Sequence, residues 1–177
     1  LEVLFDSSDR LLFAGTMTVV GTETVQRAFV ARFESFTDGA SGTLDTSFSG
    51  AGWEYFDDAP YCDTEDCRLV DVAESADPTT RYVALLESVV NGLRSDYYLV
   101  GLTPGGALDP DFGSPGTGIR LISSAELGTP QSGATLAVDD AGRIVVLLTR
   151  LEDETTSDLD VMALRYTAAG AIDTTFG

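Results

Sequence analysis

The chain is built from short apolar runs separated by Gly, Pro, Asp and Thr. The runs are rich in β-branched and aromatic residues, and none has the sustained apolar spacing and end signals of a capped amphipathic helix. They therefore predict an all-β fold. Eleven strands are expected, at residues 3–5, 10–14, 28–33, 53–56, 69–73, 81–85, 97–102, 119–122, 135–138, 143–147 and 161–166.

Several of these runs are apolar at nearly every position and do not alternate with polar residues. Such strands are typical of sheets that are covered on both faces. Three units of about four antiparallel strands would give twelve strands. We expect the missing strand to be one that precedes Leu1.

One heptapeptide occurs three times at a constant spacing. Gly42-Thr-Leu-Asp-Thr-Ser-Phe48 recurs as Gly106-Ala-Leu-Asp-Pro-Asp-Phe112 and as Gly170-Ala-Ile-Asp-Thr-Thr-Phe176. Gly52 and Gly116 continue the register beyond the first two copies. The repetition predicts a single β-repeat domain over residues 1–177, with repeats at 1–48, 49–112 and 113–177.

The motif has a structural explanation at each of its four defined positions. Gly supplies a positive φ or a close approach in a tight turn, and Asp accepts backbone N–H groups two or three residues further on. The apolar residue before Asp and the Phe after it are expected to anchor the turn in the core. The alternative is calcium binding by Asp, but the alternating acidic spacing of a calcium loop is absent. The motif residues are Gly42, Leu44, Asp45, Phe48, Gly106, Leu108, Asp109, Phe112, Gly170, Ile172, Asp173 and Phe176.

The third repeat carries a resemblance to a known family. Arg143-Ile-Val-Val, then Ala163-Leu-Arg-Tyr and the final Gly170-Ala-Ile-Asp-Thr-Thr-Phe-Gly resemble the delta-60 repeat of bacterial proteins. The first repeat departs from that pattern with a longer turn at 34–41 and with Ser49 after Phe, and the second has Thr79-Thr80 before Arg81. The resemblance implies β-propeller-like blades in a large, often exported protein, and it implies no catalytic residue.

Three blades raise the question of how the fold is completed. Closed propellers have about 4 to 8 blades, so three blades cannot close a ring alone. An open wedge would expose two apolar faces, more than soluble monomers usually do. The chain is therefore expected to be a segment of a longer polypeptide, or copies complete one another, for example as six blades in a dimer. A sandwich or solenoid built from the same repeats is the remaining alternative.

Composition excludes several function classes. The sequence has 10 Lys+Arg, 29 Asp+Glu and no His, for a formal net charge of −19. Nucleic acids and anionic membrane surfaces are bound through Lys and Arg, so neither is expected as a partner. No apolar stretch approaches the roughly 20 residues that span a bilayer, so membrane insertion is not expected. Without His, a Ser-His-Asp site cannot be formed within this chain.

The two cysteines, Cys62 and Cys67, are the only ones in the chain. Their spacing predicts a small disulfide-closed loop of a secreted or cell-surface protein. Two free thiols are the alternative. A metal site is disfavoured because two thiolates lack further soft ligands nearby.

The remaining candidates for chemistry are acidic pairs and aromatic side chains. The acidic pairs read as solvated loop charge, with a cation site or glycoside hydrolysis by two carboxylates as alternatives. The aromatics are expected in the core or between blades, with carbohydrate binding as the alternative, and Trp53 would be tested first. The acidic residues are Asp57, Asp58, Asp63, Glu65, Asp66 and Glu152 to Glu154, and the other aromatics are Tyr55, Tyr97 and Tyr98.

The function expected from these observations is a non-enzymatic, exported or cell-surface β-propeller module for binding or scaffolding. Its partner, a protein or a carbohydrate, is not identified by the sequence, and further repeats or copies of itself are expected neighbours. No cofactor is expected, and calcium is the one ion considered. The alternatives are a structural subunit of an extracellular assembly completed by self-association, and a propeller enzyme with a carboxylate-based site.

Overall fold

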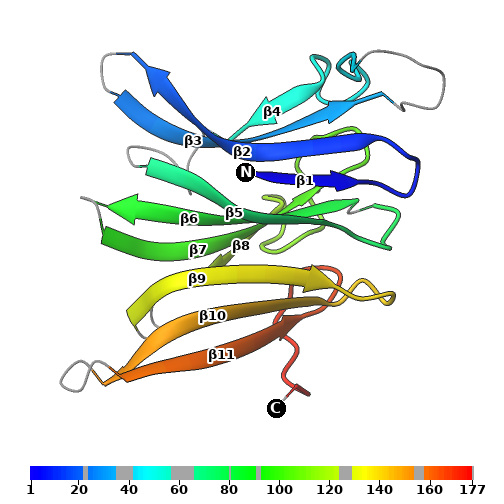
Figure 1. The fold of residues 1–177 in the computed structure, drawn as a ribbon. Helices are drawn as coiled ribbons and strands as arrows, with labels where there is room; N and C mark the ends of the chain where they lie inside the picture. The colour runs from blue at the N-terminus through cyan, green and yellow to red at the C-terminus, as the bar shows by residue number, and fades with distance from the viewer. Residues whose placement is uncertain are drawn as a thin grey trace.

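The computed structural model describes residues 1–21, 24–34, 42–56, 66–79, 81–90, 93–123, 129–153 and 158–176. This part of the chain contains eleven strands and no helix. The strands form three antiparallel sheets, and Figure 1 shows that these sheets are stacked in chain order. The all-β prediction is therefore confirmed.

Each sheet is assembled from strands that follow one another in the sequence. Sheet 1 has the order β1-β2-β3-β4, sheet 2 the order β5-β6-β7-β8, and sheet 3 the order β11-β10-β9. The strands are β1 (Glu2–Phe5), β2 (Leu11–Val20), β3 (Thr24–Phe33), β4 (Trp53–Tyr55), β5 (Asp66–Glu74), β6 (Tyr82–Val90), β7 (Leu93–Leu102), β8 (Ile119–Ile122), β9 (Thr129–Val138), β10 (Ile144–Asp153) and β11 (Asp158–Tyr166).

The incomplete sheet is the third one, so the expectation that the missing strand precedes Leu1 is wrong. The chain turns back after each of the first two Phe motifs, and the next short strand pairs with the strand that came before the motif. Thus β4 pairs with β3 through Phe29 and Tyr55, and β8 pairs with β7 through Val100 and Ile119. Sheet 1 therefore has four strands, with β1 at one edge. Among the described residues, sheet 3 has no strand equivalent to β4 and β8.

The middle sheet is covered on both faces. Side chains from Tyr82 to Val89 on β6 are all buried. Because side chains of a strand point alternately to opposite faces, they divide between two apolar clusters. Tyr82, Ala84 and Leu86 pack with sheet 1, while Val83 and Leu85 pack with sheet 3. The uninterrupted apolar run of β6 thus belongs to a strand that is covered on both faces, as this pattern predicts.

The described residues include no helix long and apolar enough to cross a membrane.

The different burial of equivalent motif positions predicts that the same substitution lowers stability by very different amounts. Phe112 is completely buried in the second cluster, whereas Phe176 is 39% exposed. We expect Phe112→Ala to lower the free energy of unfolding by about 3–5 kcal/mol through lost burial and a cavity. Phe176→Ala should cost less than about half as much, because part of its ring already contacts water. Urea denaturation of both variants measures the difference, and equal losses would contradict the placement of the sheets.

Candidate functional site

The three motif copies form the same turn. The Asp of each copy accepts the backbone N–H two residues further on, at 3.0, 3.0 and 2.9 Å. Its own carbonyl accepts the N–H of the motif Phe. These are the local hydrogen bonds expected for Asp from the sequence. The three Asp residues are Asp45, Asp109 and Asp173.

The apolar residue before each Asp does not anchor the turn in the core. Leu44, Leu108 and Ile172 are 38%, 37% and 39% exposed. Each forms an isolated bridge to the end of the preceding long strand, so its side chain lies on the outside of the turn. The expectation of two core anchors is therefore wrong for this position.

The motif also joins one sheet to the next, a role that the sequence analysis missed. The ring of Phe48 lies against Gly106 of the next repeat, and the ring of Phe112 lies against Gly170. A Cβ atom at Gly106 or Gly170 would come within 2.9 Å of the Phe ring carbons. The residue after each Phe then donates its N–H across the junction: Ser49 to the carbonyl of Gly105 at 2.6 Å, and Gly113 to that of Ala169 at 2.8 Å.

The register beyond the motif differs from the one read in the sequence. A Cβ at Gly52 would meet Leu44 and Asp45, and a Cβ at Gly118 would meet Leu108 and Asp109. Gly118 is therefore the structural equivalent of Gly52. Gly116 only matches it by spacing, because the second repeat has two additional residues after its Phe.

A buried ionic network crosses the first junction. Arg32 is 1% exposed and binds the Asp45 carboxylate at 2.8 Å. Its Nη1 donates to the carbonyl of Pro104 in the second repeat at 2.5 Å, and its guanidinium lies 4.8 Å from the centre of the Phe48 ring. Although burial opposes ionisation, hydrogen bonds from Ser47 and the charge of Arg32 lower the pKa of Asp45.

A second buried carboxylate is held beside the first network. Asp6 accepts the Tyr82 hydroxyl at 2.6 Å and pairs with Arg10 at 2.8 Å. Burial disfavours its charge, but the hydrogen bonds from Tyr82 and Arg10 outweigh that effect and lower the pKa of Asp6 to about 2. Because Tyr82 opens β6 of sheet 2, this carboxylate ties the β1–β2 turn to the next sheet.

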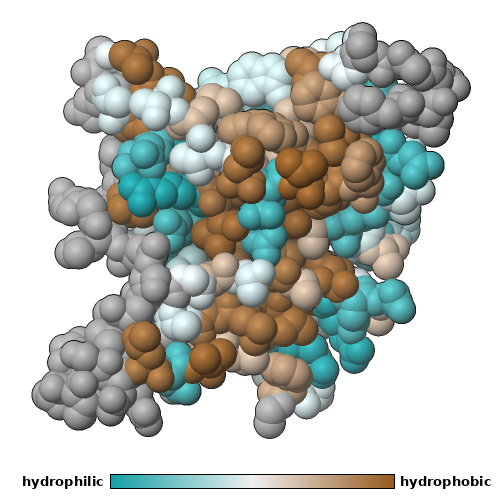
Figure 2. All heavy atoms as spheres, in the orientation of Figure 1, coloured by the Kyte–Doolittle hydropathy of each residue, from teal (hydrophilic) through white to brown (hydrophobic). Residues whose placement is uncertain are grey.

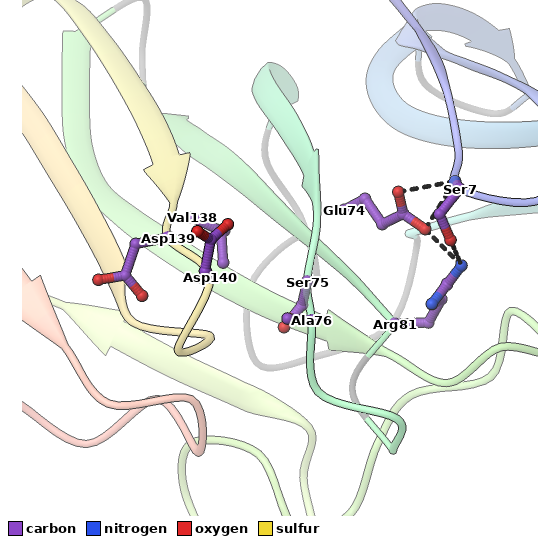
Figure 3. A pocket seen from close by; sticks show the side chains of 8 residues that line it. All are labelled: Ser7, Glu74, Ser75, Ala76, Arg81, Val138, Asp139 and Asp140. Atoms are coloured by element: carbon purple, nitrogen blue, oxygen red, sulfur yellow. Dashed lines mark hydrogen bonds and ion pairs between the residues drawn. The ribbon is translucent and has the colours of Figure 1, made fainter.

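A polar pocket with a volume of about 240 Å³ lies where the three sheets bring equivalent turns together. Figure 3 shows its lining coming from the β1–β2 turn, the end of β5 with the loop that follows, and the β9–β10 turn. Glu74 accepts the Ser7 N–H at 2.9 and 3.0 Å and pairs with Arg81 at 2.5 Å. The lining residues are Ser7, Glu74, Ser75, Ala76, Arg81, Val138, Asp139 and Asp140.

Each described carboxyl group with a shifted pKa makes hydrogen bonds or ion pairs within the fold. Hydrogen bonds and ion pairing with Arg143 lower the pKa of Asp139 at the pocket. Hydrogen bonds from Thr175, followed by pairing with Arg165, lower the pKa of Asp173 to about 2. No carboxyl group with a resolved shift has a raised pKa in this part of the chain.

The predicted acidic sites fall largely outside the described residues. Asp57, Asp58, Asp63, Glu65 and the side chains of Glu152 to Glu154 are among these. Asp66 is described, and it accepts the N–H of Gln26 at 2.8 Å across the first junction. Within the described ranges no group of three or more Cys, Asp or Glu side chains is placed to hold a metal ion.

The candidate aromatic residues separate into two groups. Tyr97 and Tyr98 are buried in the middle sheet, in the two apolar clusters, as the core interpretation predicts. Trp53 and Tyr55 stack on one another on the edge strand β4, with ring centres 5.4 Å apart. Trp53 is 38% exposed and Tyr55 is partly buried, so Trp53 is the most accessible aromatic of the four.

Only one cysteine of the predicted disulfide, Cys67, lies among the described residues. Cys67 is completely buried in β5 and is not a free thiol, but Cys62 lies outside the described residues. The bond between them stays a prediction.

Comparison with known proteins adds no assignment: no protein-family model, no curated protein and no solved structure matches this chain.

The Asp6 site predicts a pH-dependent contribution to stability. Its pKa is about 2 in the folded protein and about 3.9 in an unfolded chain. The carboxylate therefore contributes on the order of 2 kcal/mol above about pH 4, and this contribution is lost as the pH falls through about 2. Urea unfolding between pH 7 and 2 should show Asp6→Asn less stable than the wild type at pH 7, with the two curves converging in acid.

Tyr82→Phe provides the companion variant because it removes one donor to Asp6 and keeps the ring. The loss of the Tyr82 donor should raise the folded pKa of Asp6. Because the unfolded pKa is unchanged, we expect the acid-induced loss of stability to begin at the same pH as in the wild type, but to be smaller and complete at a higher pH. Parallel pH profiles for wild type and Asp6→Asn would show that this carboxylate does not stabilise the fold.

The Cys62–Cys67 disulfide predicts an intact mass lower than that of the reduced chain by two hydrogen atoms. Mass spectrometry after expression in an oxidising compartment, with and without a reductant, measures this difference. Because a loop this short constrains the unfolded chain little, reduction should cost only about 2 kcal/mol of stability. Finding the reduced mass before treatment would refute the bond.

Proposed function

We propose that this chain is a non-enzymatic β-repeat module, exported or displayed at the cell surface, that acts as a scaffold for binding or assembly. The resemblance of its motif to the delta-60 repeat and the arrangement of its sheets as partial propeller blades both support this reading. The observation that carries the proposal is the junction built twice by Phe48 on Gly106 and Phe112 on Gly170. The repeated residues hold units together, so the motif serves assembly.

The charged groups support the same reading. General acids of glycosidases have raised pKa values, whereas the resolved carboxyl shifts here are downward. The carboxylates of Asp6, Asp45 and Asp173 are each paired with Arg. Such groups stabilise turns and are poor proton donors at neutral pH.

The best place for a ligand on this scaffold is the pocket between the three turns. It combines Arg81 and Glu74 with Asp140 and several backbone segments. Residues from three separate repeats line it, so the ligand would be recognised only by the assembled stack. The stacked pair Trp53 and Tyr55 is the alternative surface, and it would suit a carbohydrate.

Hydrolysis assays separate the scaffold from its enzymatic rival. We expect the purified chain to release no 4-nitrophenol from a panel of 4-nitrophenyl glycosides above the rate of a buffer blank. Glu74→Gln and Asp140→Asn serve as matched controls because both lie at the pocket. Hydrolysis by the wild type that either substitution abolishes would replace the scaffold proposal by a carboxylate enzyme.

A further inference from the structure

Sheet 1 has an outer face that no part of the described chain covers. Leu12 and Ala14 on β2 pack toward sheet 2, so the alternating Phe13 points to the opposite side. Phe13 lies beside Val3 in the register and contacts the ring of Phe29 at 5.7 Å. This surface is called the leading face, and it comprises Val3, Phe5, Phe13, Phe29 and Trp53.

Sheet 3 has the opposite outer face. Val146 and Leu148 on β10 pack toward sheet 2, so Leu147 points outward, and on β11 Val161 does the same and is 68% exposed. Phe176, near the end of the chain, lies beside Arg165 of β11 on the same side of the sheet. This surface is called the terminal face, and it comprises Leu147, Leu159, Val161 and Phe176. The sheets are seen nearly edge-on in Figure 1, with the leading face at the top and the terminal face at the bottom.

Apolar side chains also gather at the front of the molecule, over β1, β5 and β9, with polar ones between them (Figure 2). These are the first strands of the three sheets. They would lie nearest the axis if further sheets continued the stack into a ring. A neighbouring sheet would therefore pack on one of the two outer faces and not on the front surface.

The two internal junctions indicate which kind of surface would pack against the terminal face. At both junctions a Phe from one unit packs against the motif Gly of the next. At the first, Phe48 also meets the edge of the Tyr82 ring, with centres 6.2 Å apart. In sheet 1 the positions equivalent to Gly106 and Tyr82 are Gly42 and Leu11, and Leu11 is the register partner of Phe5 on the leading face. The terminal face thus carries the Phe half of a junction, and sheet 1 carries the Gly half.

We propose that the terminal face of one copy packs onto the leading face of a second copy, reproducing the internal junction head to tail. Two copies provide six sheets, which lies within the range of closed propellers. Since the contact joins two different faces, a pair closes only when both junctions form around a two-fold axis. This inference rests on the proposed scaffold function, because it makes self-association the purpose of the repeated Phe.

The net charge opposes this association and gives it a signature. Each copy carries a formal charge of −19, so two copies repel one another at low ionic strength. Salt shortens the screening length from about 10 Å at 0.1 M to about 3 Å at 1 M. The pair should therefore become tighter as sodium chloride is added, opposite to a complex held by surface ion pairs.

Solution mass tests the pair directly. Light scattering on the eluted peak of the full chain should give twice 18.7 kDa at high salt, with dissociation on dilution. A monomer at all concentrations and salt levels would overturn the proposal, and so would a series of larger species.

Two substitutions separate a head-to-tail contact from one between like faces. Phe176→Glu places a charge on the terminal face, and Phe5→Glu, at a position that is 65% exposed, places one on the leading face. Burying an unpaired charge is costly, so each variant alone should associate at least ~100-fold more weakly. Val20→Glu is the matched control: Val20 is 79% exposed and points to the inner side of β2, away from both faces.

Mixing the two variants supplies the decisive measurement. Phe176→Glu keeps an intact leading face and Phe5→Glu an intact terminal face, so an equimolar mixture should form a heterodimer through one junction. A contact between two leading faces would be lost only in Phe5→Glu, and one between two terminal faces only in Phe176→Glu, with no rescue on mixing. Either pattern would overturn the head-to-tail arrangement.

Folding and function are followed separately in the same samples. Circular dichroism and urea midpoints should match those of Val20→Glu; if a Glu variant unfolds, Phe176→Ser and Phe5→Ser take its place. The glycoside assay stands apart from these measurements. A wild type that stays monomeric and shows no hydrolysis refutes this inference alone, whereas hydrolysis refutes the scaffold function.

Discussion

The structure depends on a phenylalanine ring that packs against the motif glycine of the following unit. Phe48 and Phe112 reach across to glycines whose missing side chain makes room for the ring. The contact is directional, because the unit that supplies the ring and the unit that supplies the glycine occupy different sides of the junction. Repetition of such a contact builds a stack with two unlike ends. It also explains why a sheet of mostly apolar strands can be stable in the middle of the chain and still leave apolar side chains exposed at either end.

Two arginines occupy the same position in the first and third repeats. Arg32 and Arg165 each pair with the Asp of their own motif and lie over its Phe ring, at 4.8 and 4.6 Å. The second repeat has Gly101 at the same position, where a Cβ would collide with Phe112. There the Phe112 ring occupies the space that the Arg side chain takes in the other two repeats. The residue at this position can thus be Arg, as at the first junction, or Gly, as at the second, because the Phe ring is buried in both. Removing Arg32 alone would be costly, since the buried carboxylate of Asp45 would keep only the more distant Arg10, at 3.8 Å, as a cationic partner.

The strands and the turn chemistry of Asp could be derived from the sequence, because both depend on local pattern. The uninterrupted apolar runs predicted strands covered on both faces, which holds for β6 and β7 but not for β10, where Leu147 is 42% exposed. The spacing of Phe48, Phe112 and Phe176 indicated three units. The partner of each strand could not be derived in this way. The strand after the motif pairs backward with β3 or β7, which shifts the sheets by one strand relative to the repeats and moves the incomplete sheet to the other end. The pocket was missed because Ser7, Glu74 and Asp140 share no motif and meet only through stacking.

The same stacking shows how a repeat scaffold can acquire a binding site without weakening its junctions. The turn that opens each unit is closed by one backbone hydrogen bond, which Asp6, Ser75 and Asp139 donate to the carbonyl of the following Arg. In the first and third units the Asp side chain also captures that Arg. In the second unit Ser75 cannot do so, and Arg81 turns instead to Glu74 and to the Ser7 hydroxyl of the neighbouring unit. A single exchange of Asp for Ser therefore redirects a cation from its own turn toward the space between sheets, while the Phe and Gly that hold the stack together are untouched.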